Sequence, residues 1–250
     1  MRVYRTLLRR ELGAYFVSLT GYVVIAVAAF LIGLSFVDLL VAVRQETLPL
    51  HVTEVFYQTP YFWVLLLVSA PVVTMRLFAQ EKFAGTYETL MTAPVRDVEV
   101  VLAKFSAAFL FFVVMWLPLL VAVLLVRHLA GDLAALDWRV LGVTCLGIGL
   151  LGALFLAMGC FASSLTRTQT VAAVLGFLFG VSLFLLGFVA GRLAQGNTWT
   201  AAVFGQLTLF EHMQDFTRGI VDVRPVVCYA SLTALFLYLT VRVVESRRWK

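Results

Sequence analysis

Charged residues are scarce in this sequence. Asp, Glu, Lys and Arg make up 13% of it, while 62% of its residues are hydrophobic. Soluble domains carry about 25% charged residues, so this composition excludes an ordinary soluble globular domain. The first apolar run is also too long for a secretory signal and lacks a small-residue cleavage site, so we expect no cleavable signal peptide.

Residues that bind metals or carry redox chemistry are few and scattered. The three cysteines fall within or at the edges of apolar runs without close pairing, and we expect small buried side chains. The three histidines have no ligand spacing, and we expect each to be solvated or interfacial. These residues are Cys145, Cys160, Cys228, His51, His128 and His212.

Groups for energy conversion are missing from the apolar runs. None of these runs has an ionisable residue at its centre, which argues against an ion-coupled pump or an intramembrane protease. The lysines are Lys82, Lys104 and Lys250, and none follows a phosphate-binding loop. We therefore expect no ATP hydrolysis, catalytic site, cofactor or metal in this chain.

Long apolar runs dominate what remains. Five exceed the roughly 18 residues that a helix needs to cross a bilayer, and a sixth does so with its flanks. The sequence predicts one all-α polytopic membrane domain over residues 1–250, with six transmembrane helices. The predicted spans are residues 15–40, 58–79, 101–127, 139–165, 170–191 and 224–244.

The basic residues give the orientation. If both termini are cytoplasmic, 13 of the 19 Lys and Arg residues lie inside, as the positive-inside rule requires. This bias explains the net charge of +5, which therefore does not indicate a nucleic-acid partner.

Two amphipathic segments flank the spans. Residues 1–15 place apolar side chains on one helical face and arginines on the rest, which predicts an interfacial helix against membrane lipid. Apolar residues between Phe204 and Ile220 recur every three or four positions, which predicts an amphipathic helix on the outer surface. Pro60, Tyr61, Phe62 and Trp63 are expected to open the second span with an aromatic belt, and Pro71 is expected to kink that span.

The fourth span is rich in glycine, which lets helices approach closely. We expect Gly142, Gly149 and Gly152 to pack against neighbouring helices or a second copy of the chain.

The most polar interior segment lies between the second and third spans, over residues 78–104. Gly85 offers a break where positive φ costs little, and Thr86 can cap a short helix that ends at Pro94. Glu88 adds an acidic first turn. We expect a cytoplasmic coupling helix here, although an ordinary polar loop is the alternative.

This segment resembles the cytoplasmic loop of ABC-2-type permeases, in particular the gliding-motility permease branch. Residues 11–18 and 210–222 are similar to the same branch, although Leu19 stands where relatives often carry proline. The residues that carry the resemblance in the loop are Glu81, Gly85, Thr86, Glu88, Leu90, Thr92, Pro94 and Lys104.

The resemblance implies a permease subunit, usually of an exporter, in the bacterial inner membrane. Such a subunit dimerises with a second permease copy and binds cytoplasmic ABC ATPase subunits, which hold the ATP and Mg²⁺. Tyr87 and Leu90 are expected to fill an apolar pocket on the ATPase, while Glu81 and Glu88 contact it or brace the loop. The full expected interface is Glu81, Lys82, Gly85, Thr86, Tyr87, Glu88, Leu90, Thr92 and Pro94.

Two other functions remain open at this stage. One is a non-transporting scaffold or force-transmitting subunit of an envelope machine, with an accessory envelope subunit as a possible partner. The other is a passive channel. If the loop does not couple the ATPase, the inner turn over residues 163–169 is the next candidate.

Overall fold

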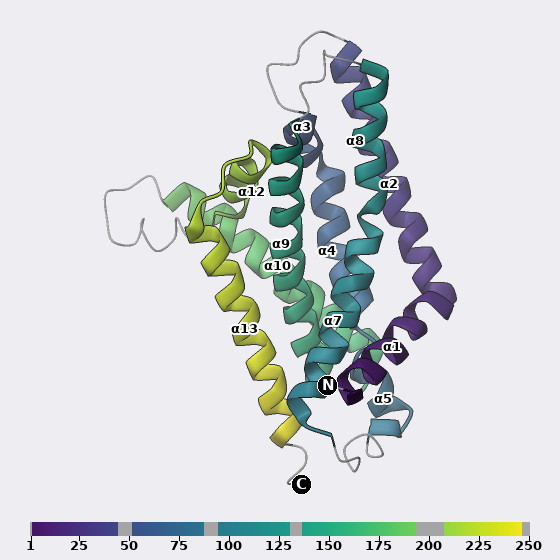
Figure 1. The fold of residues 1–250 in the computed structure, drawn as a ribbon. Coiled ribbons are helices and arrows are strands. Elements are labelled where there is room, and N and C mark those ends of the chain that lie inside the picture. The colour runs from purple at the N-terminus through teal and green to yellow at the C-terminus, as the bar shows by residue number, and fades with distance from the viewer. Residues whose placement is uncertain (1, 45–51, 88–94, 131–136, 194–207, 247–250) are drawn as a thin grey trace.

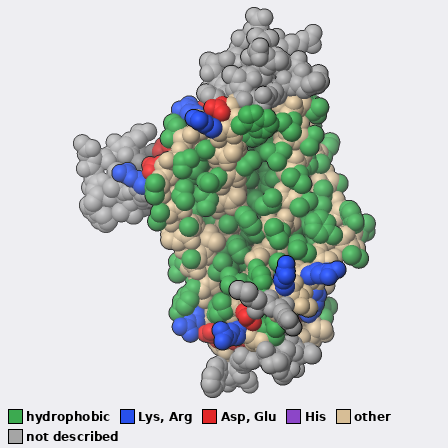
Figure 2. Space-filling model, in the orientation of Figure 1, with side chains coloured by type: hydrophobic (Ala, Val, Ile, Leu, Met, Phe, Trp, Pro, Cys, Tyr) green, Lys and Arg blue, Asp and Glu red, His purple; other side chains and the backbone are tan. Residues whose placement is uncertain are grey.

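The structure is a computed structural model that describes residues 2–44, 52–87, 95–130, 137–193 and 208–246. Every regular element in these ranges is a helix, which confirms the predicted all-α class. Within the described ranges, six helical segments are long and apolar enough to cross a membrane. A broad apolar surface separates charged side chains at the two ends, as Figure 2 shows for one face.

The six spans run lengthwise through one elongated bundle (Figure 1). The first described helix begins and the last described helix ends at the same end of this bundle, here called the terminal end, together with the short helix α5 (Ala79–Phe83). The spans are α2 (Leu19–Arg44), α4 (Pro60–Thr74) continuing through a turn into α5, α7 (Asp97–Met115) with α8 (Leu117–Ala130), α9 (Trp138–Leu165), α10 (Gln169–Leu193) and α13 (Val223–Ser246).

The first span begins later than expected. The N-terminal helix α1 (Arg2–Val17) runs past Tyr15, the chain bends at Ser18, and α2 starts at Leu19. Gly21 makes this bend possible, because a Cβ there would lie 2.1 Å from the Tyr15 carbonyl oxygen. The sequence showed an uncharged run across the bend, and an uncharged run alone does not mark where a helix changes direction.

The third span is interrupted at Trp116. α7 ends at Met115 and α8 begins at Leu117, immediately before Pro118. The Trp116 amide still donates to the carbonyls of Phe112 and Val113, at 3.3 and 3.1 Å. Proline has no amide hydrogen and its ring crowds the preceding turn, which accounts for a break at this position. In the second span, Pro71 is buried inside α4, which ends soon afterwards at Thr74.

Helix α9 lies at the centre of the bundle and contacts α4, α7, α10, α12 and α13. A Cβ on Gly152 would lie 2.1 Å from the Phe112 ring, so the absence of a side chain permits that contact. A Cβ on Gly149 would reach Phe109 only at 3.9 Å, and one on Gly142 would meet nothing within 4 Å. Within one chain, the predicted close packing therefore holds for Gly152 but not for Gly142.

The opposite end is closed by two short helices, α3 (Val52–Gln58) and α12 (Leu209–Thr217). The expected surface helix corresponds in part to α12, but Leu209, Met213 and Phe216 are buried against the protein. Phe204 and Leu207 lie outside the described residues. An apolar stripe shows that a helix has a buried face, but it does not distinguish a lipid surface from a protein neighbour.

Two further expectations at this end were wrong. Of the expected aromatic belt, Tyr61 is half-buried, but Phe62 and Trp63 are buried in a cluster with Trp116 and Phe210. The ring centroids in this cluster are 4.5–5.4 Å apart, so these two residues do not face lipid. His212 is also buried, and its Nδ1 lies 3.0 Å from the Tyr229 hydroxyl. Tyr57 of α3 and Phe210 of α12 cover Phe62 and Trp63, while His212 turns inward from α12 to Tyr229 on α13. The linear sequence places these side chains near an aqueous boundary and does not show such contacts.

Candidate functional site

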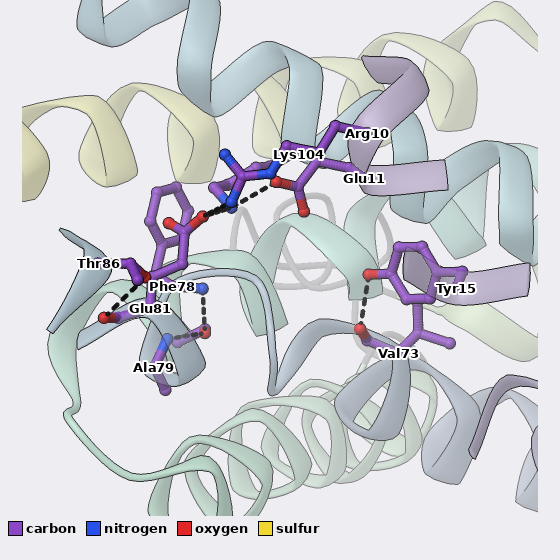
Figure 3. Close-up of polar contacts among 10 residues, drawn as sticks. Arg10, Glu11, Tyr15, Val73, Phe78, Ala79, Glu81, Thr86 and Lys104 are labelled. Atoms are coloured by element: carbon purple, nitrogen blue, oxygen red, sulfur yellow. Dashed lines mark hydrogen bonds and ion pairs between the residues drawn. The ribbon is translucent and has the colours of Figure 1, made fainter. Parts of the chain in front are cut away.

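One buried serine on α9 forms hydrogen bonds with the start of α5. Ser163 Oγ accepts hydrogen bonds from the backbone amides of Phe78 and Ala79, at 3.1 and 3.2 Å (Figure 3). The same hydroxyl donates to the Met75 carbonyl at 3.2 Å. The first amides of a helix have no partner within the helix, so this hydroxyl satisfies groups that would otherwise need water. Residues 163–165 belong to α9, so the inner turn predicted over residues 163–169 begins only after Leu165.

A compact charge cluster joins α5 to α1 and α7. Lys104 Nζ lies 2.9 Å from Glu81 Oε1 and 3.0 Å from Glu11 Oε1. Arg10 Nη2 approaches the same Glu81 oxygen at 3.5 Å. Figure 3 shows the side chains of α1 reaching across to Glu81 and Lys104. Three helices that are far apart in sequence thus meet at one carboxylate.

Lys104 is the most deeply buried member, with a side chain only 3% exposed. Its ammonium also lies 5.5 Å from the centroid of the Phe78 ring, within the range of a cation–π contact. A buried charge is tolerated only when it is paired with good geometry, and here two carboxylates provide that pairing. Since removing either partner would strand a charge, the cluster favours one fixed arrangement of α1, α5 and α7.

The chain turns sharply at the end of α5. Gly85 has φ of +73°, which confirms the expected left-handed break. Thr86 Oγ1 makes a long hydrogen bond of 3.5 Å back to the Glu81 carbonyl (Figure 3). Thr86 and Tyr87 are helical. The remaining residues of the expected coupling helix, Glu88, Leu90, Thr92 and Pro94, lie outside the described residues.

Tyr87 does not occupy the position expected of it. Its side chain is buried in this chain's own core, with Lys82 Nζ 5.3 Å from the ring centroid. Lys82 also donates a hydrogen bond to the Ser164 carbonyl on α9. The expectation that Tyr87 fills a pocket on a partner is therefore wrong for the arrangement seen here. The chain turns at Gly85, shortly before Tyr87, and the Tyr87 ring packs back onto the bundle.

The neighbouring Phe83 has the opposite environment. It is 75% exposed at the end of α5, the helix that projects at the terminal end of the bundle (Figure 1). Exposed aromatic side chains often serve as anchors in protein interfaces. The α5 segment therefore has buried hydrogen bonds and ion pairs to the bundle, and it also carries an exposed aromatic side chain.

Residues 16–183 match the family model described as ABC-2 family transporter protein. The match covers more than half of the chain, from the end of α1 into α10. The chain belongs to the ABC-2 transporter family. No curated protein matches it closely enough to count as a relative.

Membership in the ABC-2 family identifies the chain as a multi-pass membrane subunit of a transporter. It also gives the α5 segment a context, because this family implies a partnership with an ABC ATPase subunit. Glu81 and Lys82 make their described contacts inside this ABC-2 chain, with Lys104, Arg10 and Ser164. Of the two roles left open for Glu81, these contacts match bracing the loop.

Three residues that organise the site in this ABC-2 chain were not expected to contribute to it: Arg10, Glu11 and Phe83. Ser163 was expected only as the first residue of an alternative coupling turn, and not as a hydrogen-bond partner of α5. One signal in the sequence could have found the charged pair. Lys104 stands inside the start of a predicted span, where a lone cation requires a partner, and Glu11 is the first acidic residue of the chain. Phe83 and Ser163 have no comparable signal, since their roles depend on how α5 meets α9.

Proposed function

We propose that this chain is the permease subunit of an ATP-driven ABC transporter in the bacterial inner membrane. A separate ATPase subunit binds the ATP and Mg²⁺, and its hydrolysis drives substrate movement, in the direction of export. The observation that carries the proposal is that α5 makes two sets of buried contacts with the bundle. Ser163 links it to α9 by hydrogen bonds, and Lys104 links it to α7 and α1 by ion pairs. Membership in the ABC-2 family supports the ATPase partner.

In this mechanism α5 transmits displacement from the ATPase into the bundle. A push on α5 reaches α9 through the three hydrogen bonds of Ser163, and reaches α7 through the buried contact between Lys104 and Glu81. Buried polar contacts transmit strain better than exposed ion pairs, which contribute only about 0–1 kcal/mol each. Arg10 and Glu11 extend the same connection to α1.

The proposed ATPase-facing surface comprises the exposed residues Phe83, Gly85 and Thr86, together with the segment that contains Glu88, Leu90, Thr92 and Pro94. Glu81, Lys82 and Tyr87 act behind this surface as supports. The orientation places the terminal end in the cytoplasm, in agreement with the excess of basic residues there. Two permease copies form the membrane part of the transporter, with Gly149 and the exposed Gly142 available for contacts between copies.

The test is co-purification of the full chain with an ABC ATPase encoded beside it, and measurement of ATP turnover by the complex. Phe83→Ala should weaken ATPase binding about 30-fold, the equivalent of roughly 2 kcal/mol for an interface anchor. Phe177→Ala is the matched control, because Phe177 is an exposed phenylalanine on the spanning helix α10. If Phe83→Ala retains both the ATPase and its turnover, the proposed surface is wrong. If no ATPase associates with the unaltered chain, the scaffold alternative is favoured.

A further inference from the structure

A cavity of about 290 Å³ lies beside the charge cluster, between α1, α5 and α7. Its charged lining consists of the cations Arg10, Arg76 and Lys104 and the carboxylates of Glu11 and Glu81. The volume is far above the roughly 10–15 Å³ that one water molecule needs. The cavity therefore has room for a group of several atoms and offers it both signs of charge.

Two residues that line this cavity each carry a buried polar atom with no hydrogen-bond partner within the described part of the chain. Arg76 Nη1 donates to Ser18 Oγ at 2.9 Å, but its buried Nε has no acceptor. Glu81 Oε1 receives Lys104 and Arg10, but its buried Oε2 has no donor. Buried polar groups are almost always paired, and such an orphan often marks a missing water or ligand. Here one donor and one acceptor lack a partner, and both belong to residues that line the same cavity.

The surroundings of the cavity point to the membrane. Ser18, at the bend between α1 and α2, lines the cavity. The residues on either side of it, Val17 and Leu19, are 86% and 79% exposed. Apolar exposure continues along α2 at Val23 and Phe30. A molecule with a polar head in the cavity could therefore lay an apolar tail along α2.

We propose that this cavity binds the headgroup of a phospholipid that carries both a phosphate and a primary ammonium group. The phosphate would accept hydrogen bonds from Arg76 and Arg10, and the ammonium would donate to Glu81 Oε2. A headgroup with a phosphate but no ammonium group would bring its negative charge close to the carboxylates of Glu11 and Glu81 without a compensating cation of its own. A choline headgroup has no N–H donor, and a glycerol headgroup has no positive charge. Small rotations of the Arg76 and Glu81 side chains would bring the orphaned atoms into contact with the headgroup.

The ligand can be varied while the protein stays unchanged. The purified full chain in detergent is titrated with short-chain phosphatidylethanolamine, phosphatidylcholine and phosphatidylglycerol, and with water-soluble phosphoethanolamine. We expect phosphatidylethanolamine to bind at least about tenfold more tightly than each of the others, which corresponds to about 1.4 kcal/mol, because charge-assisted hydrogen bonds are stronger than neutral ones. Equal affinity for the three lipids overturns the proposal. Phosphoethanolamine binding as tightly as the lipid would assign the cavity to a soluble ligand and also overturns it.

Variants test whether the binding occurs in this cavity. Arg76→Gln should lose about tenfold in affinity for phosphatidylethanolamine, since a charged donor to phosphate is removed. Arg167→Gln makes the same change at an exposed arginine in the turn after α9, and should leave the affinity within about twofold. Equal affinities of the two variants contradict the assignment to this cavity.

N-methylation of the lipid provides a further test, which uses only the unaltered chain and so does not require a variant to fold. With the unaltered chain, affinity should fall stepwise as one, two and three methyl groups replace the N–H donors. A flat series overturns the proposal. These measurements need no ATPase, so the lipid site can fail while ATPase coupling stands, and the reverse.

Discussion

Lys104 Nζ on α7 lies 2.9 Å from Glu81 Oε1 on α5 and 3.0 Å from Glu11 Oε1 on α1. The three residues are separated by long stretches of chain, and each belongs to a different helix. Lys104 is nearly inaccessible to solvent, so its charge depends on these two carboxylates. The position of α5 therefore depends on contacts with both α1 and α7 at the terminal end of the bundle.

The first prediction concerns this buried cation. Lys104→Met should lower the free energy of unfolding by about 3–5 kcal/mol, because it leaves Glu81 and Glu11 without their buried partner. The measurement is thermal or denaturant unfolding of the purified chain in detergent. Arg242→Met is the control, since the Arg242–Glu245 pair is 61% and 37% exposed and should contribute about 0–1 kcal/mol. If the two variants lose similar free energies of unfolding, the buried cluster stabilises the chain no more than the exposed ion pair does.

Ser163→Ala should loosen α5 while leaving the spans folded. The variant removes the acceptor for the Phe78 and Ala79 amides, so their hydrogen exchange should become faster. Ser164→Ala is a close control, because the Ser164 hydroxyl donates only within α9, to the Phe161 carbonyl at 2.7 Å. Unchanged exchange at Phe78 and Ala79 in the first variant would mean that other contacts hold α5.

A glycine pair on α9 separates tight packing from helix propensity. Gly152→Ala should destabilise the chain by about 1–3 kcal/mol, because its Cβ would lie 2.1 Å from the Phe112 ring in a packed core. Gly149→Ala should be neutral or stabilising by up to about 1 kcal/mol, because alanine is the better helix former and its Cβ meets Phe109 at an ordinary 3.9 Å. Unfolding midpoints of the two variants decide the order, and equal midpoints would contradict the close contact.

Much of the fold could be predicted from the sequence because each span must be a long apolar helix. The six spans, the helical N-terminus and the left-handed Gly85 all follow from local rules on apolar length, amphipathicity and backbone freedom. The bend at Ser18 and the interruption at Trp116 were not predicted. Both lie within uncharged runs, where hydropathy does not reveal a change in helix direction.

The site could be predicted only as a location. The sequence placed it after the second span, and α5 with Gly85 and Thr86 lies there. It could not predict that Tyr87 is buried while Phe83 is exposed, because that depends on the angle at which α5 meets α9. It placed Ser163 only in an alternative coupling turn, and it could not predict the hydrogen bonds of Ser163 to α5 because these partners lie far away in the sequence.

The proposed orientation can be tested by cysteine labelling from either side of the membrane. Glu211 on α12 and Arg167 in the turn after α9 are both exposed and lie on opposite sides in this topology. Glu211→Cys should react with an impermeant reagent in intact cells, and Arg167→Cys only after the membrane is opened. His212 would be a poor probe because its side chain is buried. The three native cysteines require a background with each replaced, and a reversed pattern would invert the topology.

The last prediction concerns the buried His212 at the end of the bundle opposite the termini. Burial lowers the pKa of His212 from its ordinary value of 6.5, while Asp215, Glu211 and Asp222 raise it by a smaller amount. The unfolded chain therefore binds the proton more readily than the folded chain, so stability should rise with pH. Stability should be lost as the pH falls below 6.5 and approaches the lowered pKa of the folded state.

Unfolding midpoints at about pH 5 and about pH 8 measure this effect, since histidine is the side chain that titrates between them. His212→Gln should reduce the difference between the two midpoints, because glutamine does not titrate. It can also keep a hydrogen bond to the Tyr229 hydroxyl, which lies 3.0 Å from Nδ1. His51 and His128 are present in both proteins, so they contribute equally to the comparison. If the variant shows the same pH dependence as the unaltered chain, another group is responsible for it.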